Sequence, residues 1–155
     1  MRTDFVIDEN VLFFAHRGTD PQGRPSHHSA ALLTEISVNG HRVCFSKETL
    51  ARYSSKLDLL KGEIAIAVNV PKIFWGLLAS KLQGREVDTS SVDAPKEINA
   101  KDAPFVTVAI AASPSILATY DSPLLHEMDD ADLASQKVRG LLVRQALEEA
   151  RKPDC

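Results

Sequence analysis

Short strand-like segments that alternate with helical patterns along the chain are the feature that most limits its fold. Four segments are strand candidates, at residues 5–7, 42–45, 85–88 and 115–119. Segments with helical spacing, capping residues or a closing glycine lie between them. Strands separated by helices favour a parallel sheet that is covered on both faces. We therefore expect an α/β fold, a three-layer α/β/α sandwich around a central, mainly parallel sheet of four to five short strands.

Helices are expected over most of the remaining chain. The expected ranges are 11–15, 26–38, 46–60, 71–82, 103–112 and about 132–151. Ser46, followed three residues later by Thr49, predicts the start of the third helix. Phe74 and Trp75 are expected to pack in the core rather than to stack on bases. Because no clear fifth strand follows Asp121, residues 131–155 are expected to form a helical tail.

The charge balance excludes one class of function. The 155 residues include 18 Lys+Arg and 21 Asp+Glu, a formal net charge of -3. A nucleic-acid binder that works by bulk positive charge is therefore excluded, and any contact with phosphate must be local or carried by a bound cation. Cys44 and Cys155 have no zinc-site or disulfide spacing, and no apolar stretch reaches the roughly 18 residues of a membrane span. We expect a soluble, cytoplasmic protein.

Three aspartates are expected to meet at one edge of the sheet. Asp102 precedes helix 103–112 and Asp121 follows strand 115–119. About ten helical residues rise roughly 15 Å, and about five strand residues return roughly 16 Å, so the two acids finish at the same edge. Asp8 ends the first strand, and the carboxyl ends of parallel strands share that edge. Sequence order therefore predicts an acidic site at this edge.

A divalent cation is the natural partner of such a site. Two unit charges about 4 Å apart repel by roughly 4 kcal/mol at an effective dielectric near 20. Mg²⁺ and Mn²⁺ prefer hard oxygen ligands, and a bound ion activates water and polarises a phosphodiester. The competing interpretation gives each acid a local role: Asp102 as a helix N-cap, Asp121 as a turn former and Asp8 as a surface acid.

Four blocks of the sequence, in their order and separation, resemble the PIN-domain nucleases, a family that includes the toxin halves of VapBC-type pairs. The blocks are residues 5–12, 43–53, 102–112 and 117–125. The resemblance spans most of residues 5 to 125 and implies a single PIN-like domain over 1–155. It assigns the family's first, third and fourth acids to Asp8, Asp102 and Asp121. It assigns the two small polar residues that support these acids to Asn10 and Thr119.

The second acid departs from the family pattern. Arg52 occupies the position where many relatives carry a glutamate, and Glu48 lies one helical turn earlier, on the same helix face. Glu48 is a candidate substitute, although a glutamate in a first helical turn is also favoured by the helix dipole. Arg52 is either a phosphate clamp or a salt-bridge partner of the acids. Arg17 and Arg24, in or beside the Gly/Pro-rich segment 16–28, are weaker candidates for contacts with an RNA backbone, a solvated loop being the competing interpretation.

The resemblance implies a Mg²⁺- or Mn²⁺-dependent endoribonuclease that hydrolyses phosphodiester bonds of single-stranded RNA. It also implies a homodimer and, for toxin members, an antitoxin protein that inserts a basic residue into the acidic site. Arg52 motivates an alternative, a catalytically inactive PIN scaffold that binds RNA or a protein partner. The pair Asp8-Glu9 also suggests a phospho-accepting receiver domain, but the acceptor aspartate and late lysine that such a domain needs have no candidates.

Overall fold

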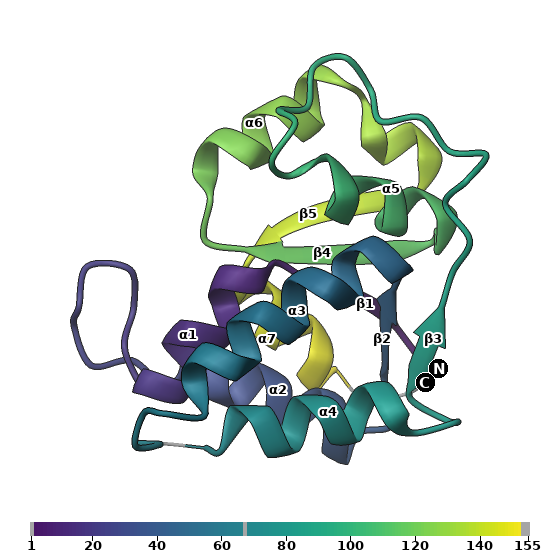
Figure 1. Ribbon diagram of the computed structural model, residues 1–155. Coiled ribbons are helices and arrows are strands. Elements are labelled where there is room, and N and C mark those ends of the chain that lie inside the picture. Colours follow the sequence, from purple (N-terminus) through teal and green to yellow (C-terminus); the bar gives the residue numbers. More distant parts are fainter. Residues whose placement is uncertain (1, 67, 153–155) are drawn as a thin grey trace.

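A five-stranded parallel sheet forms the centre of the computed structural model, which describes residues 2–66 and 68–152 (Figure 1). Its strands are β1 (Asp4–Ile7), β2 (Arg42–Phe45), β3 (Gly84–Glu86), β4 (Ser115–Thr119) and β5 (Val138–Leu142). The strand order is β3-β2-β1-β4-β5, and every neighbouring pair is parallel. The chain runs from β1 outward to β3 and then returns to β4 on the other side of β1. Ligand sites in open α/β sheets form at such a reversal, outside the carboxyl ends of the strands.

Helices cover both faces of the sheet, which confirms the expected α/β/α sandwich. They are α1 (Glu9–Arg17), α2 (His28–Val38), α3 (Lys47–Leu60), α4 (Val70–Ala79), α5 (Ala103–Ala111), α6 (Ser122–Asp130) and α7 (Val143–Arg151), with a short 3-10 helix at Leu133–Gln136. In Figure 1, α5 and α6 lie on one side of the sheet, and α1, α2, α4 and α7 lie on the other. Helix α3 packs against α1, α4 and α5.

Local sequence signals place several of these elements correctly. The predicted cap of α3 is a capping box, in which the Ser46 hydroxyl accepts from the Thr49 amide at 3.2 Å and the Thr49 hydroxyl accepts from the Ser46 amide at 2.9 Å. All four residues of β1 are buried, as expected for a central strand covered on both faces. Phe74 is fully buried, and Trp75 is half-buried against the core.

The helix expected over 132–151 is wrong for residues 132–142 and confirmed for residues 143–151. Residues 138–142 form strand β5, and α7 begins only at Val143. Arg139 and Gly140 interrupt the apolar run, so no buried-strand pattern is visible along this segment. Pairing with β4, from Ser115↔Val138 onward, supplies the non-local hydrogen bonds that decide for a strand. Residues 153–155 of the expected tail, including Cys155, lie outside the described residues.

The loop expected at 16–28 also begins later than predicted. Helix α1 continues through Arg17 and ends at Gly18, whose φ of 69° is readily adopted by glycine. His16 is buried, with Nε2 3.1 Å from the Glu63 carbonyl oxygen and Nδ1 accepting from the Val70 amide at 3.4 Å. Its role is therefore to join α1 to the start of α4.

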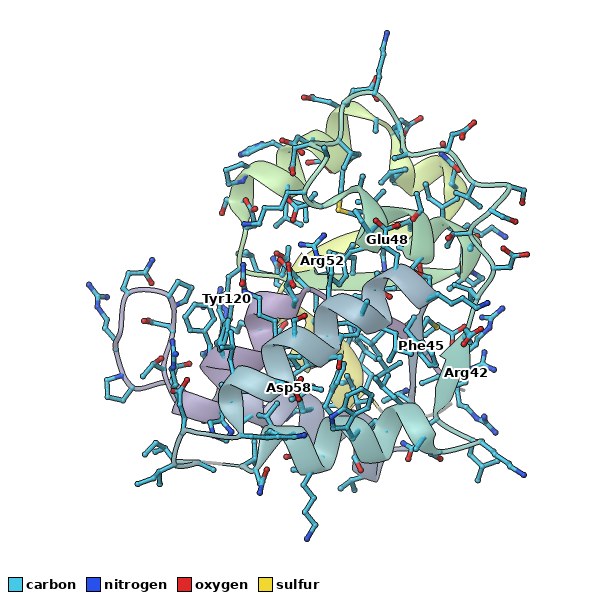
Figure 2. The ribbon with its side chains drawn as sticks, viewed as in Figure 1. Arg42, Phe45, Glu48, Arg52, Asp58 and Tyr120 are labelled. Carbon is cyan, nitrogen blue, oxygen red and sulfur yellow. The ribbon has the colours of Figure 1, made fainter. Side chains whose placement is uncertain are left out.

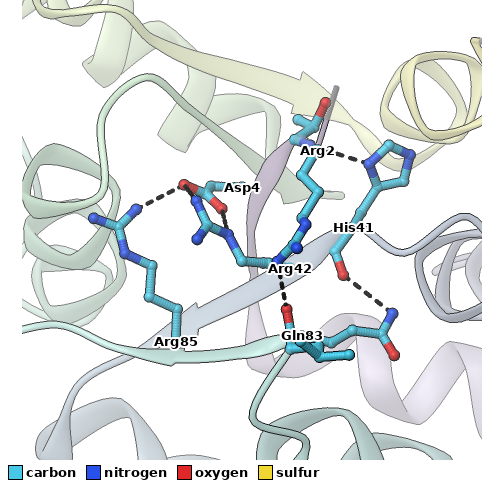
Figure 3. A network of polar contacts seen from close by, with 8 residues as sticks. Arg2, Asp4, His41, Arg42, Gln83 and Arg85 are labelled. Carbon is cyan, nitrogen blue, oxygen red and sulfur yellow. Dashed lines mark hydrogen bonds and ion pairs between the residues drawn. The ribbon is translucent and has the colours of Figure 1, made fainter. Parts of the chain in front are cut away.

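A buried carboxylate ties the amino ends of three strands together. Asp4 accepts two hydrogen bonds from Arg42, at 2.6 and 2.9 Å, and one from Arg85 at 2.7 Å (Figure 3). These residues lie on β1, β2 and β3. Cys44 lies close by, and burial, followed by the charge of Asp4, raises the pKa of its thiol to about 12. The thiol therefore stays protonated at neutral pH and is a poor nucleophile.

Replacement of Asp4 by asparagine should destabilise the protein. Asn cannot offer two charged oxygens to two guanidinium groups, so we expect the free energy of unfolding to fall by about 1–3 kcal/mol, the range for an impaired charged hydrogen bond. Urea denaturation followed by circular dichroism measures the change. The matched control is Asp58→Asn, because Asp58 is exposed and, among the described residues, forms an ion pair only with Lys61. This variant should change stability by less than about 0.5 kcal/mol. Equal unfolding midpoints for the two variants would contradict the role given to Asp4.

Candidate functional site

Asp8 and Thr119 meet at the carboxyl edge of the sheet, beside the point of reversal. Asp8 directly follows β1, and Thr119 ends the adjacent strand β4. Ile7 pairs with Ala118, so the next residue on each strand turns its side chain to the same face of the sheet. The Thr119 hydroxyl donates a hydrogen bond of 2.7 Å to the Asp8 carboxylate, and both residues are buried.

Asp102 lies at the start of α5 and is 4% exposed. Its side chain does not cap α5, so the local role that competed with a site role is absent. Instead, the Asn99 amide group donates to the Asp102 carboxylate at 2.7 Å, and the Asp102 backbone amide donates to the Asn99 side-chain oxygen at 3.0 Å. Asn99 is itself held by Glu127 of α6, at 2.7 Å. The Asp102 carboxylate is therefore oriented by two residues that the sequence did not indicate.

The two buried aspartates lie within range of each other's charge. Burial is the main cause that raises the pKa of Asp8 above its ordinary value of 3.8, the Thr119 hydrogen bond opposes this, and the charge of Asp102 raises it further. Within the described residues 2–66 and 68–152, neither carboxylate forms an ion pair with a Lys, Arg or His side chain. Because the pKa of Asp8 is higher in the folded protein than in the unfolded chain, ionisation of Asp8 lowers the free energy of unfolding. This loss is absent below the unfolded-state pKa and is complete above the raised folded-state pKa.

Asp121 has a local role, but it caps a helix and is not the turn former of the competing interpretation. Its carboxylate accepts from the Leu124 amide at 3.1 Å and caps α6. Its backbone amide donates to the Thr119 hydroxyl at 2.9 Å, so it adjoins the hydroxyl that contacts Asp8. Among the described residues, no three His, Cys, Asp or Glu side chains are arranged to hold a metal ion. In the structure, the charge of Asp102 therefore acts on Asp8, whereas the Asp121 carboxylate caps α6.

An ion pair between Glu9 and Arg52 completes this edge, and the sequence prediction missed Glu9. Glu9 is the first residue of α1, and its side chain is only 7% exposed. Arg52 lies on α3 (Figure 2). Its guanidinium group donates to the Glu9 carboxylate and to the Lys101 carbonyl oxygen. The guanidinium carbon also lies 4.9 Å from the centroid of the Phe105 ring. Of the two roles open to Arg52, the structure shows the salt bridge, and its acid is Glu9.

The remaining predicted site residues lie apart from this group or at its border. Glu48 is exposed and lines a cavity of about 560 Å³ beside β2 and β3, which none of the three predicted aspartates lines. Arg17 donates two hydrogen bonds of 3.0 Å to Glu63. Arg24 is exposed in the loop between α1 and α2, and Asn10 is half-buried in the first turn of α1. The sequence signal that could have indicated Glu9 is its place directly after Asp8.

Comparison with known protein families, curated proteins and solved structures gave no match for this chain. In the part of the chain that the structure describes, no helix is both long enough and apolar enough to cross a bilayer.

Proposed function

We propose that this protein is a Mg²⁺- or Mn²⁺-dependent endoribonuclease of the PIN-domain type that cleaves single-stranded RNA, with the cation held by Asp8 and Asp102. One observation carries the proposal. Two buried carboxylates lie at the reversal point of a parallel sheet, each held by a neutral donor, and no basic side chain of the described residues pairs with either. Buried charges are normally paired or bound to metal.

The chemistry of this pair suits Mg²⁺. Mg²⁺ is usually bound through one or two carboxylates, keeps several waters and takes substrate phosphates as further ligands, so a cage of three protein ligands is not required. Thr119 bonds to Oδ2 of Asp8, and Asn99 bonds to Oδ2 of Asp102. Oδ1 of each carboxylate accepts no side-chain hydrogen bond from the residues that the structure describes. These two oxygens are the ones that would hold the ion.

A bound cation would supply an activated water and a Lewis acid for the phosphodiester. The chain's own residues would position the carboxylates and the substrate. Thr119 orients Asp8 and Asn99 orients Asp102, as second-layer partners do at metal sites. Arg52 keeps 26% of its side chain exposed beside the acids, where its free N–H groups would bind a phosphate oxygen. Asp121 adds negative charge at the same edge. Glu48 receives no role in this arrangement.

A second candidate is a PIN-like scaffold that binds RNA or a protein partner without cleaving. The Arg52–Glu9 ion pair favours it, because a guanidinium group stands where many of the nucleases that the sequence resembles carry an acid. A fixed positive charge beside Asp8 and Asp102 weakens the attraction of that edge for a cation. For both the nuclease and the scaffold, we propose that the protein forms a homodimer and binds an antitoxin-like partner protein.

One pair of measurements separates the two candidates. Calorimetric titration of the purified protein with Mn²⁺ should show binding, and the protein should cleave a labelled single-stranded RNA in Mn²⁺ but not in excess EDTA. A duplex of the same sequence is the substrate control. RNA binding without cleavage, together with no heat from Mn²⁺, would reject the nuclease in favour of the scaffold.

A further inference from the structure

A basic cavity lies at the opposite edge of the sheet from the acidic pair. Its volume is about 400 Å³, and it opens beside the amino ends of β4 and β5 and the residues that lead into β1. Its lining consists of Arg2, Thr3, Pro114, Ser115, Ile116, Ala134, Lys137 and Arg139. A strand of five residues spans roughly 16 Å, so this cavity is separate from the acidic edge.

Three cations and no acid line this cavity, in a chain whose net charge is -3. Arg2 donates to the Leu82 carbonyl oxygen at 2.9 Å and forms no ion pair with an acid among the described residues. Arg139 pairs with Glu149 at 3.1 Å across an exposed contact, and such pairs are weak. Lys137 forms no ion pair with any described residue. The cavity is therefore a local positive site of the kind that the overall charge balance still permits.

The rest of the lining is suited to the uncharged part of a ligand. The exposed residues Pro114 and Ala134 give the cavity apolar walls, and Thr3 adds a hydroxyl group. Ile116 and Ser115 border the cavity but are buried, and the Ser115 hydroxyl donates to the Ala109 carbonyl oxygen at 2.7 Å. Its volume falls within the roughly 300–1,000 Å³ of small-molecule sites. Guanidinium and ammonium groups bind phosphate oxygens, and an apolar wall packs against a flat ring. This combination selects a ligand that has both an anionic group and a ring.

We propose that this cavity binds a nucleoside phosphate, either a free nucleotide or one nucleotide unit of a single-stranded RNA. Arg2, Lys137 and Arg139 contact the phosphate, and the base or sugar packs on Pro114 and Ala134, which are both exposed. The proposal is independent of the nuclease proposal, because none of its residues belongs to the acidic edge.

The test compares two double variants with equal changes of charge. Arg2→Glu/Lys137→Glu alters the cavity, and Lys81→Glu/Arg144→Glu alters exposed cations that do not line it. Binding of AMP, inorganic phosphate and a labelled single-stranded RNA is measured by calorimetry and fluorescence anisotropy in EDTA. The cavity variant should bind AMP or RNA at least tenfold more weakly than wild type, while the control variant should bind within about twofold of wild type. Loss of two phosphate contacts should also lower the salt dependence of RNA binding by about 1–2 in log–log slope.

The outcomes assign the ligand and decide the proposal. Binding of both AMP and RNA identifies a free nucleotide as a sufficient ligand, and binding of RNA alone identifies the strand. Inorganic phosphate as tight as AMP would overturn the nucleoside part of the proposal. No binding by wild type, or equal affinity in the two double variants, would overturn all of it. Thermal unfolding checks that the variants are folded. If Arg2→Glu/Lys137→Glu is not folded, the milder variant Lys137→Gln replaces it. Asp102→Asn should bind AMP as wild type does, which separates this site from the acidic edge.

Discussion

Replacing Asp102 by asparagine will abolish RNA cleavage while the protein stays folded. Asp102 supplies one of the two buried carboxylates to which we assign the cation, and an amide oxygen carries no charge to hold it. Loss of even an outer-layer partner costs roughly 10–100-fold at metal sites, so loss of a ligand should lower the cleavage rate by about 10³-fold or more. Mn²⁺ binding measured by calorimetry should fall with it.

The Asp102→Asn variant should also be at least as stable as wild type when no metal is present. The amide oxygen of the new side chain accepts the hydrogen bond that Asn99 now donates, and removal of the charge relieves the repulsion that raises the pKa of Asp8. Asp129→Asn is the control, because Asp129 is exposed on α6. Cleavage by the Asp102→Asn variant at the wild-type rate in Mn²⁺ would remove Asp102 from the site.

Replacing Arg52 by glutamate should destabilise the metal-free protein strongly and make its stability depend on Mn²⁺. The Glu9 side chain is almost fully buried, and Arg52 is its ion-pair partner. Breaking a buried pair by removing one partner typically costs about 3–5 kcal/mol. The new acid also stands where many of the nucleases that the sequence resembles carry a glutamate, so under the proposed function the variant should bind Mn²⁺ about tenfold or more tightly than wild type.

Thermal unfolding with and without Mn²⁺ measures both effects, because a ligand that binds only the folded state stabilises by RT ln(1 + [L]/Kd). The midpoint should rise more on adding Mn²⁺ in Arg52→Glu than in wild type. The double variant Glu9→Gln/Arg52→Gln removes both charges of the pair and should regain most of the lost stability. An Mn²⁺-dependent rise in the midpoint no larger than that of wild type would show that Arg52 does not limit cation binding.

Elements with a strong local signal could be predicted from the sequence. The burial of β1, the Ser46 capping box and the strand at 115–119 follow from residue type and spacing within a few positions. The contact between Asp8 and Thr119 follows from the adjacency of β1 and β4 and from the shared carboxyl edge of parallel strands. The sequence indicated Thr119 as a supporting residue only through the resemblance to the PIN-domain nucleases. Strand β5 was not predictable in this way, because its pairing partner lies more than 20 residues away in the chain.

The sequence by itself determined the alternating strands and helices, the parallel sheet they imply, and the edge at which the acids gather. Only the tertiary structure decided what each acid does there. The structure holds the Asp102 carboxylate through Asn99, gives Asp121 to the cap of α6, and pairs Glu9 with Arg52, 43 residues away. The physical reason is that periodicity and capping are set by neighbours within a few residues. The partner of a buried charge is set by whichever distant side chain the packing brings within hydrogen-bonding distance.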